Sequence, residues 1–313
     1  MKIHYSFDSL KGIKNPVVTT GTFDGVHVGH QVIIRRLKKL ARVHDGESVL
    51  ITFHPHPRRV LYPEGKGKDL LLICSQKEKK VLLEKTGLDH LVIIEFTRQF
   101  SQISSRQFVE ELLIGKLNAK VIVVGFNHPF GHNREGDFSY LYNLSRDYGF
   151  EVEEIPEQDI HNESVSSTKI RKALLEGNIQ RANAYLDHYY ILKGKTSIHP
   201  ERSGQFGRPV YIISLEEDVK LIPPDGVYAV NIQNGEEVEK GLISVNRWTL
   251  EKNVLSPATE IECCFLNQDI NPEEKELTFY FHKKIRDGSV CEDESRVKEL
   301  FEKDLIAIEE LIY

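Results

Sequence analysis

The first half of the chain alternates short apolar segments with segments of helical periodicity. The apolar segments are rich in β-branched residues and predict strands over 16–22, 48–53, 90–96, 120–126 and 151–155. The segments between them carry amphipathic patterns that predict helices over 29–44, 75–86, 104–117 and 137–148. Apolar strands that alternate with helices are typical of a parallel sheet covered on both faces. We therefore expect an α/β domain that binds its ligand beyond the carboxyl ends of the strands.

The junction between the first predicted strand and the first predicted helix contains an HxGH motif. Residues 21–30 read GTFDGVHVGH, and the three-residue spacing puts His27 and His30 on one side of the first helical turn. A helix N-terminus has unpaired N–H groups and about half a positive charge, so it binds anions. This arrangement suits attack on the α-phosphate of a nucleoside triphosphate, because prepositioned donors meet the charge that builds on the transferred group. The alternative is a surface turn that happens to contain two histidines.

Length and composition favour a cytoplasmic enzyme of two domains. A chain of 313 residues is longer than one core usually supports. Its net charge of −6 argues against nucleic acid as the main partner, because binding to a phosphate backbone needs basic excess. No apolar run approaches the roughly 20 residues that span a membrane, and the first residues lack the apolar region of a secretory signal. The 4 cysteines show no CxxC spacing, so we expect reduced, buried thiols.

Two polar segments follow predicted strands at the ligand-binding edge. Residues 53–58 read FHPHPR, and their two prolines favour an extended shape that cannot join a helix. This segment is either a rigid surface loop or a ligand loop with His56 as its candidate binding residue. Residues 125–137 are rich in glycine and aromatic residues and contain Asn127 and Arg134. They either stack on a planar base and hold a phosphate, or form an ordinary connection from strand to helix.

A third segment, residues 166–172 (SSTKIRK), reads as the start of a helix that runs to Gly177. Ser167 or Thr168 is a suitable N-cap. The basic residues Lys169 and Arg171 in the first turn oppose the helix dipole unless an anion binds there. We therefore expect a second anion site at this helix terminus.

In their order and spacing, these motifs resemble the bacterial FAD synthetases, which are bifunctional riboflavin kinase/FMN adenylyltransferases. The resemblance extends over nearly all of residues 1–186. It implies a Rossmann-like nucleotidyltransferase domain over 1–186 that transfers AMP from ATP to the phosphate of FMN. The products would be FAD and pyrophosphate, and Mg²⁺ would accompany the ATP.

The resemblance also implies roles for individual residues. His27 and His30 would hold the ATP phosphates and the transition-state charge, with Asp24 in the same turn. The triphosphate would bind at the second helix terminus, and Asn127 stands where the family uses Asp or Asn to orient nucleotide or flavin. The candidate catalytic residues of this half are His27, His30, Asp24 and Arg171, and the candidate binding residues are Gly21, Phe23, Gly29, His56, Asn127, Ser167 and Thr168. His128-Pro129 replaces a pair that in close relatives commonly includes an arginine, so one basic contact is missing.

The second half of the chain has a different pattern, with short strands and turns in place of the alternation. Strands are predicted over 190–195, 209–213, 226–232, 240–245, 261–266 and 277–281. This spacing indicates a small antiparallel barrel. An amphipathic helix over 294–312 would close it.

In the family that this chain resembles, the barrel over 187–313 is the riboflavin kinase module. The family's GFPTAN segment, whose Thr and Asn help to bind the Mg²⁺ of the nucleotide, is replaced here by RPVYIIS over 208–214. The NIGxRPTF segment has changed to SVNRWTL over 244–250. Glu262 matches the family's catalytic glutamate. We therefore expect an active FMN adenylyltransferase joined to an impaired kinase barrel.

Two alternatives remain open on the sequence. In the first alternative, the kinase is active with substitute metal ligands, for example Ser214, Ser203 or Thr196, and the chain also makes FMN from riboflavin. In the other alternative, the chain is a flavin- or nucleotide-binding regulator descended from the enzyme. The substrates expected in the first case are ATP, FMN and riboflavin.

Overall fold

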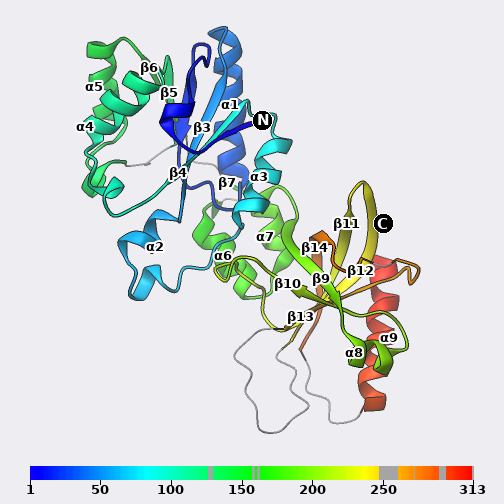
Figure 1. Cartoon of the computed structure of the whole chain (residues 1–313). Coiled ribbons are helices and arrows are strands. Elements are labelled where there is room, and N and C mark those ends of the chain that lie inside the picture. The colour runs from blue at the N-terminus through cyan, green and yellow to red at the C-terminus, as the bar shows by residue number, and fades with distance from the viewer. Residues whose placement is uncertain are drawn as a thin grey trace. The chain divides into compact units, whose positions relative to one another are not determined.

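The computed structural model describes residues 1–125, 130–156, 159–160, 163–246, 260–270, 272–288 and 294–311 (Figure 1). The chain divides into two compact units. Unit 1 comprises Met1–Leu72 and Lys79–Ser166, and unit 2 comprises Ile73–Glu78 and Ser167–Tyr313. No helix in the described ranges has both the length and the apolar character required to cross a membrane.

Unit 1 contains a parallel sheet with the strand order β1-β4-β3-β2-β5-β6. Its strands are β1 (Lys2–His4), β2 (Val17–Thr20), β3 (Ser48–His54), β4 (His90–Glu95), β5 (Val121–Gly125) and β6 (Glu151–Ile155). The predicted α/β sheet is confirmed, and β2 to β6 match the five predicted strands. The additional strand β1 has three mostly exposed residues at the edge, so it carries no apolar signal in the sequence.

Helices cover both faces of this sheet. On one face, α4 (Ser105–Gln107), which continues as the π-helix η4 (Phe108–Lys116), and α5 (Phe138–Tyr148) pack on alternate strand residues such as Val18, Val49 and Ile122. On the other face, α1 (Val28–Val43) contacts β2, β3 and β5 (Figure 1). Helix α3 (Gln76–Lys85) is divided between the units, since its residues 76–78 belong to unit 2. The remaining elements of unit 1 are η1 (Phe7–Ser9), η2 (Gly65–Gly67), η3 (Phe100–Gln102), η5 (His132–Arg134), β7 (Asp159–Ile160) and β8 (Glu163–Ser164).

The segment after β3 corrects one expectation. It was predicted to be too rigidly extended to join a helix, yet Pro57 is the first residue of α2 (Pro57–Leu61). His56 caps this helix, and its Nδ1 accepts a hydrogen bond from the backbone N–H of Arg58 at 3.2 Å. A proline fits the first helical position because the N–H that it lacks would be unpaired there in any case.

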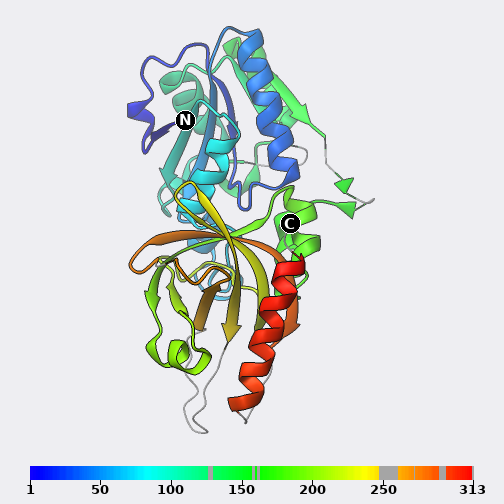
Figure 2. The same cartoon turned by 90° about the vertical axis from the view of Figure 1, so that its right-hand side faces the viewer.

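Unit 2 is a closed antiparallel barrel with the strand order β10-β13-β12-β11-β14-β9. Its strands are β9 (Tyr190–Ile198), β10 (Tyr211–Ser214), β11 (Gly226–Asn234), β12 (Glu237–Asn246), β13 (Glu260–Phe265) and β14 (Glu276–Asp287). Helix α9 (Glu294–Leu311) packs Phe301, Leu305 and Ile308 on the barrel (Figure 2). The predicted barrel and its closing helix are confirmed. Unit 2 also contains α6 (Ser167–Leu175), α7 (Ile179–Leu186) and α8 (Pro200–Phe206).

Three of the four cysteines lie in the described residues. Cys74, Cys263 and Cys264 are buried and unbridged. Burial raises the pKa of the Cys264 thiol to about 11. Burial also raises the pKa of Cys263, so these two thiols remain protonated at neutral pH, and all three side chains pack as small apolar core residues. The domain boundary expected after residue 186 lies between α7 and β9 and stays a prediction.

Candidate functional site

The loop between β2 and α1 is a tight turn with an unusual backbone. Phe23 and Val26 have positive φ angles of 47° and 43°, a region that side chains rarely adopt. Both side chains are buried, at 2% and 1% exposure, and anchor the turn in the core. The carbonyl oxygen of Thr22 accepts hydrogen bonds from Thr52 Oγ1 at 3.1 Å and from Lys79 Nζ at 2.8 Å. Strained backbone that is held this firmly is found mainly at functional sites.

This turn brings the two histidines of the HxGH motif together. His27 is the N-cap of α1 and His30 lies in the first helical turn. Their rings stack with centroids 3.7 Å apart, and Phe23 packs on His30 at 4.7 Å. A Cβ atom on Gly29 would lie 3.3 Å from the His27 ring, so glycine leaves the space that this imidazole needs. The predicted grouping of the two imidazoles on one side of the helix start is confirmed.

A pocket of about 260 Å³ opens beside these histidines. It lies at the carboxyl ends of β2, β5 and β6, where the strand order changes direction between β2 and β5. Open α/β sheets bind ligands at such a switch point, and the N-terminus of α1 adds a positive dipole end. The pocket is lined by Thr19, Thr20, Gly21, Thr22, Phe23, His27, Gly29, His30, Ile33, Gly125, Ile155, Pro156 and Val165. Asp24 does not line it and is buried in the turn at 1% exposure.

A second pocket, of about 800 Å³, shares residues 20–22 with the first. Its walls are aromatic, and Phe53 and Phe100 lie 5.9 Å apart between ring centroids. His56, Arg58, Ser101 and His132 add polar groups to its lining. The phenylalanines in its lining are Phe53, Phe96, Phe100, Phe108 and Phe130.

None of these five phenylalanines was a named candidate in the sequence, because they come from four separate segments of the chain. The available signal was the position of Phe53 and Phe96 at the carboxyl ends of β3 and β4. Asn127 and its neighbours 126–129 lie outside the described residues, as does the side chain of Arg134.

The second predicted anion site lies on α6, which belongs to unit 2 and is described by itself. The helix begins at Ser167, one of the two residues expected as its cap, and ends at Leu175, before the expected end at Gly177. Thr168 is exposed, Arg171 is half-buried, and the first turn has no acidic residue. Lys169 lies in the first turn of this helix and Arg171 follows it, and the anion site itself stays a prediction.

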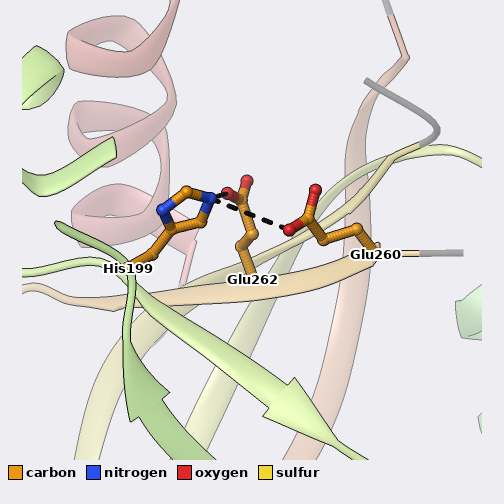
Figure 3. A group of neighbouring side chains, drawn as sticks. All are labelled: His199, Glu260 and Glu262. Atoms are coloured by element: carbon orange, nitrogen blue, oxygen red, sulfur yellow. Dashed lines mark ion pairs between the residues drawn. The ribbon is translucent and has the colours of Figure 1, made fainter. Parts of the chain in front are cut away.

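In the barrel, Glu262 lies on β13 opposite Ile212 of β10 and Ser244 of β12. It is 5% exposed, and burial raises the pKa of its carboxyl group. Nε of Arg202 approaches its Oε1 at 3.3 Å, and Nε2 of His199 approaches the same oxygen at 3.5 Å. His199 also lies 3.7 Å from Oε1 of Glu260 (Figure 3). Neither His199 nor Glu260 was a candidate in the sequence.

The family model described as FAD synthetase matches residues 11–169, and the model described as riboflavin kinase matches residues 186–312. The chain belongs to the bifunctional riboflavin kinase/FMN adenylyltransferase family. Its two units therefore correspond to known modules, a nucleotidyltransferase and a kinase barrel.

Curated members of this family are similar along most of their length. The Listeria monocytogenes bifunctional enzyme is 34% identical over 85% of this chain and 83% of its own. The Buchnera aphidicola (Schizaphis graminum) enzyme is 32% identical over 97% of both chains. A solved Streptococcus pneumoniae structure described as a macrolide-efflux protein superposes with a TM-score of 0.86 at 26% identity, over 98% of both chains. The match of both modules favours the bifunctional alternative over the impaired kinase that the altered motifs predict.

Proposed function

We propose that this chain transfers AMP from ATP to the phosphate of FMN, forming FAD and pyrophosphate. The observation that carries this proposal is the stacked pair His27 and His30 at the N-terminus of α1, beside the pocket of about 260 Å³. A phosphate oxygen of FMN would attack the α-phosphorus of ATP, and pyrophosphate would leave. The imidazoles and the helix N–H groups would stabilise the charge on the transferred group, and no covalent protein nucleophile is needed.

The pocket of about 800 Å³ supports FMN as the acceptor. Its volume is in the range of small-molecule sites, and its aromatic walls suit a planar flavin ring. Because the two pockets share residues 20–22, a flavin bound here would direct its phosphate toward the nucleotide. Arg58 in the lining offers a guanidinium to that phosphate.

Mg²⁺ would enter with the nucleotide. It usually keeps several waters and binds through substrate phosphates with few protein carboxylates. Asp24, the carboxylate of the turn, does not line the nucleotide pocket, so we infer that it positions the turn. The ion would partly neutralise the triphosphate while His27 and His30 contact the transferred group.

Riboflavin phosphorylation is the second candidate function. The buried Glu262 supports it, because a raised pKa suits a general base that takes the proton from a riboflavin hydroxyl. The match of residues 186–312 to the riboflavin kinase model supports it independently. Both activities would make one chain convert riboflavin to FAD.

One experiment tests both functions. The full chain is incubated with ATP, Mg²⁺ and either FMN or riboflavin, and the flavins are separated by chromatography. We expect FAD from FMN and, with an active kinase, FMN and FAD from riboflavin. Loss of the riboflavin reaction in Glu262→Gln, but not in the exposed control Glu274→Gln, would support the kinase. Flavin binding without turnover would instead support a regulator and contradict both proposals.

A further inference from the structure

Three metal-ligating side chains meet where β9 ends and β13 begins (Figure 3). One ligand atom from each of His199, Glu260 and Glu262 lies within 4.8 Å of the others. In the described parts of the chain, no second group of three His, Cys, Asp or Glu residues meets this criterion. The cluster lies in the barrel and outside both pockets of unit 1.

The fold produces this grouping from separate segments. Glu260 and Glu262 are two residues apart on β13, so their side chains project from the same face of the strand. His199 follows β9 directly, and its backbone N–H donates to the carbonyl of Val210 at 2.8 Å. This bond holds the start of α8 next to β10, the strand between β9 and β13 in the barrel.

The electrostatics of the cluster favour a bound cation. The Glu262 side chain is 7% exposed, and its Oε1 is a buried atom without a hydrogen bond of good geometry. The two carboxylates both approach His199, and the guanidinium of Arg202 pairs with Glu262. Because a buried, incompletely paired carboxylate is costly, a second positive charge would stabilise the cluster.

We propose that His199, Glu260 and Glu262 bind one divalent transition-metal ion, with Mn²⁺ and Zn²⁺ as the fitting class. Imidazole nitrogen suits transition metals, whereas Mg²⁺ prefers oxygen ligands alone. Ligands at about 2.1 Å from one ion are at most about 4.2 Å apart. The separations of 3.5 Å and 3.7 Å from His199 to the carboxylates fall within that limit.

The site gives a physical account of the altered kinase motif. The chain lacks the Thr and Asn of the GFPTAN segment, and the hydroxyls of Thr196 and Ser203 are engaged with backbone groups. A metal held through Oε1 of Glu262 would supply positive charge for nucleotide phosphates and would leave Oε2 of the same side chain to take the riboflavin proton. This consequence rests on the proposed kinase function, whereas the metal site does not.

Metal binding is tested on the full chain without nucleotide or flavin. Mn²⁺ is titrated in excess Mg²⁺, and free Mn²⁺ is followed by electron paramagnetic resonance. We expect one tight Mn²⁺ per chain, and a loss of affinity of about tenfold or more in His199→Ala and Glu260→Gln. His188→Ala and Glu274→Gln, which change residues outside the cluster, serve as matched controls and should bind like the unaltered chain.

Two results would overturn the site. One is the absence of Mn²⁺ and Zn²⁺ binding in the full chain. The other is binding that His199→Ala and Glu260→Gln leave unchanged, with circular dichroism showing that both variants are folded. Because the titration contains no substrate, a chain that binds the metal but does not phosphorylate riboflavin would retain the site and lose only the kinase function.

Discussion

The imidazole rings of His27 and His30 stack face to face, with centroids 3.7 Å apart and planes inclined by 20°. The stack depends on the positive φ angles of the preceding turn and on the missing side chain of Gly29. Two ring donors therefore converge beside one pocket at the start of α1. We expect this pair to bind the nucleotidyl group that is transferred.

Replacing His30 with alanine should lower the rate of FAD formation by about 10²–10³-fold, because one prepositioned donor to the transition state is lost. The affinity for ATP should fall less than the rate. His44→Ala, at the far end of α1, is the matched control. The measurement is turnover of FMN to FAD, with ATP binding followed separately. Full activity of the His30 variant would show that this histidine has no role in catalysis.

Arg171→Ala should weaken ATP binding and turnover together. A guanidinium on the triphosphate contacts the ground state and the transition state alike, so KM for ATP should rise. Lys172→Ala on the same helix is the control, because its side chain is 77% exposed and its contact to Glu176 is 3.8 Å long. Titration calorimetry with a non-hydrolysable ATP analogue reports the binding directly. Unchanged affinity would mean that the second anion site is not on α6.

Phe100→Ala should raise KM for FMN by about tenfold and leave KM for ATP unchanged. Phe100 lines the larger pocket and packs on Phe53 and Phe96, so its removal takes away stacking and apolar area from the flavin. Tyr142→Ala, an exposed aromatic residue on α5, is the control. Equal changes in both KM values would indicate general disruption of unit 1 and contradict a flavin pocket.

The buried ion pair between Lys220 and Glu78 should dominate the stability of unit 2. Lys220 Nζ donates to Glu78 Oε2 at 2.6 Å and to the carbonyls of Ile73 and Ile191, and both charged side chains are almost fully buried. Removing one partner leaves the other charge buried and unpaired, so Lys220→Met should lower the free energy of unfolding by about 3–5 kcal/mol. Urea unfolding measures this loss.

Lys77, which pairs with Glu216 and Glu276 at the surface, provides the comparison for Lys220. Lys77→Met should cost at most about 1 kcal/mol, because solvent screens these groups. The double variant Glu78→Gln with Lys220→Met should lose less than the sum of its single variants, since neither charge is then left unpaired. Similar decreases in the free energy of unfolding for Lys220→Met and Lys77→Met would show that the buried pair contributes no more to stability than the surface pairs.

The stability of unit 1 should depend on pH through Asp89. Burial by itself would raise the pKa of this carboxyl group. Hydrogen bonds from the N–H and hydroxyl of Ser48 outweigh that effect and lower the pKa below 3.8. The unfolded chain therefore takes up the proton first, and the stabilisation present above pH 3.8 is lost as the pH falls through the lowered pKa. Urea unfolding of the protein and of Asp89→Asn should differ near neutral pH and converge in acid. A difference independent of pH would exclude this carboxylate as the source.

Much of the local structure could be predicted from periodicity. The parallel strands β2 to β6, the barrel and α9 follow from side-chain patterns that burial imposes along each segment. The prediction for residues 53–58 was wrong because proline blocks the interior of a helix but not its first position. The strand β1 could not be predicted, since three exposed edge residues carry no pattern.

The sequence by itself determined the two classes of domain, the HxGH turn and the family. These depend on residues that are close along the chain, where spacing alone decides which side chains share a face. The tertiary structure alone decided that five phenylalanines from four segments line one pocket, and that His199 meets Glu260 and Glu262. It also showed that residues 73–78 belong to the barrel unit, where Glu78 forms its ion pair with Lys220. Such contacts depend on strand order and packing, and no pattern within a single segment specifies which distant segment it will meet.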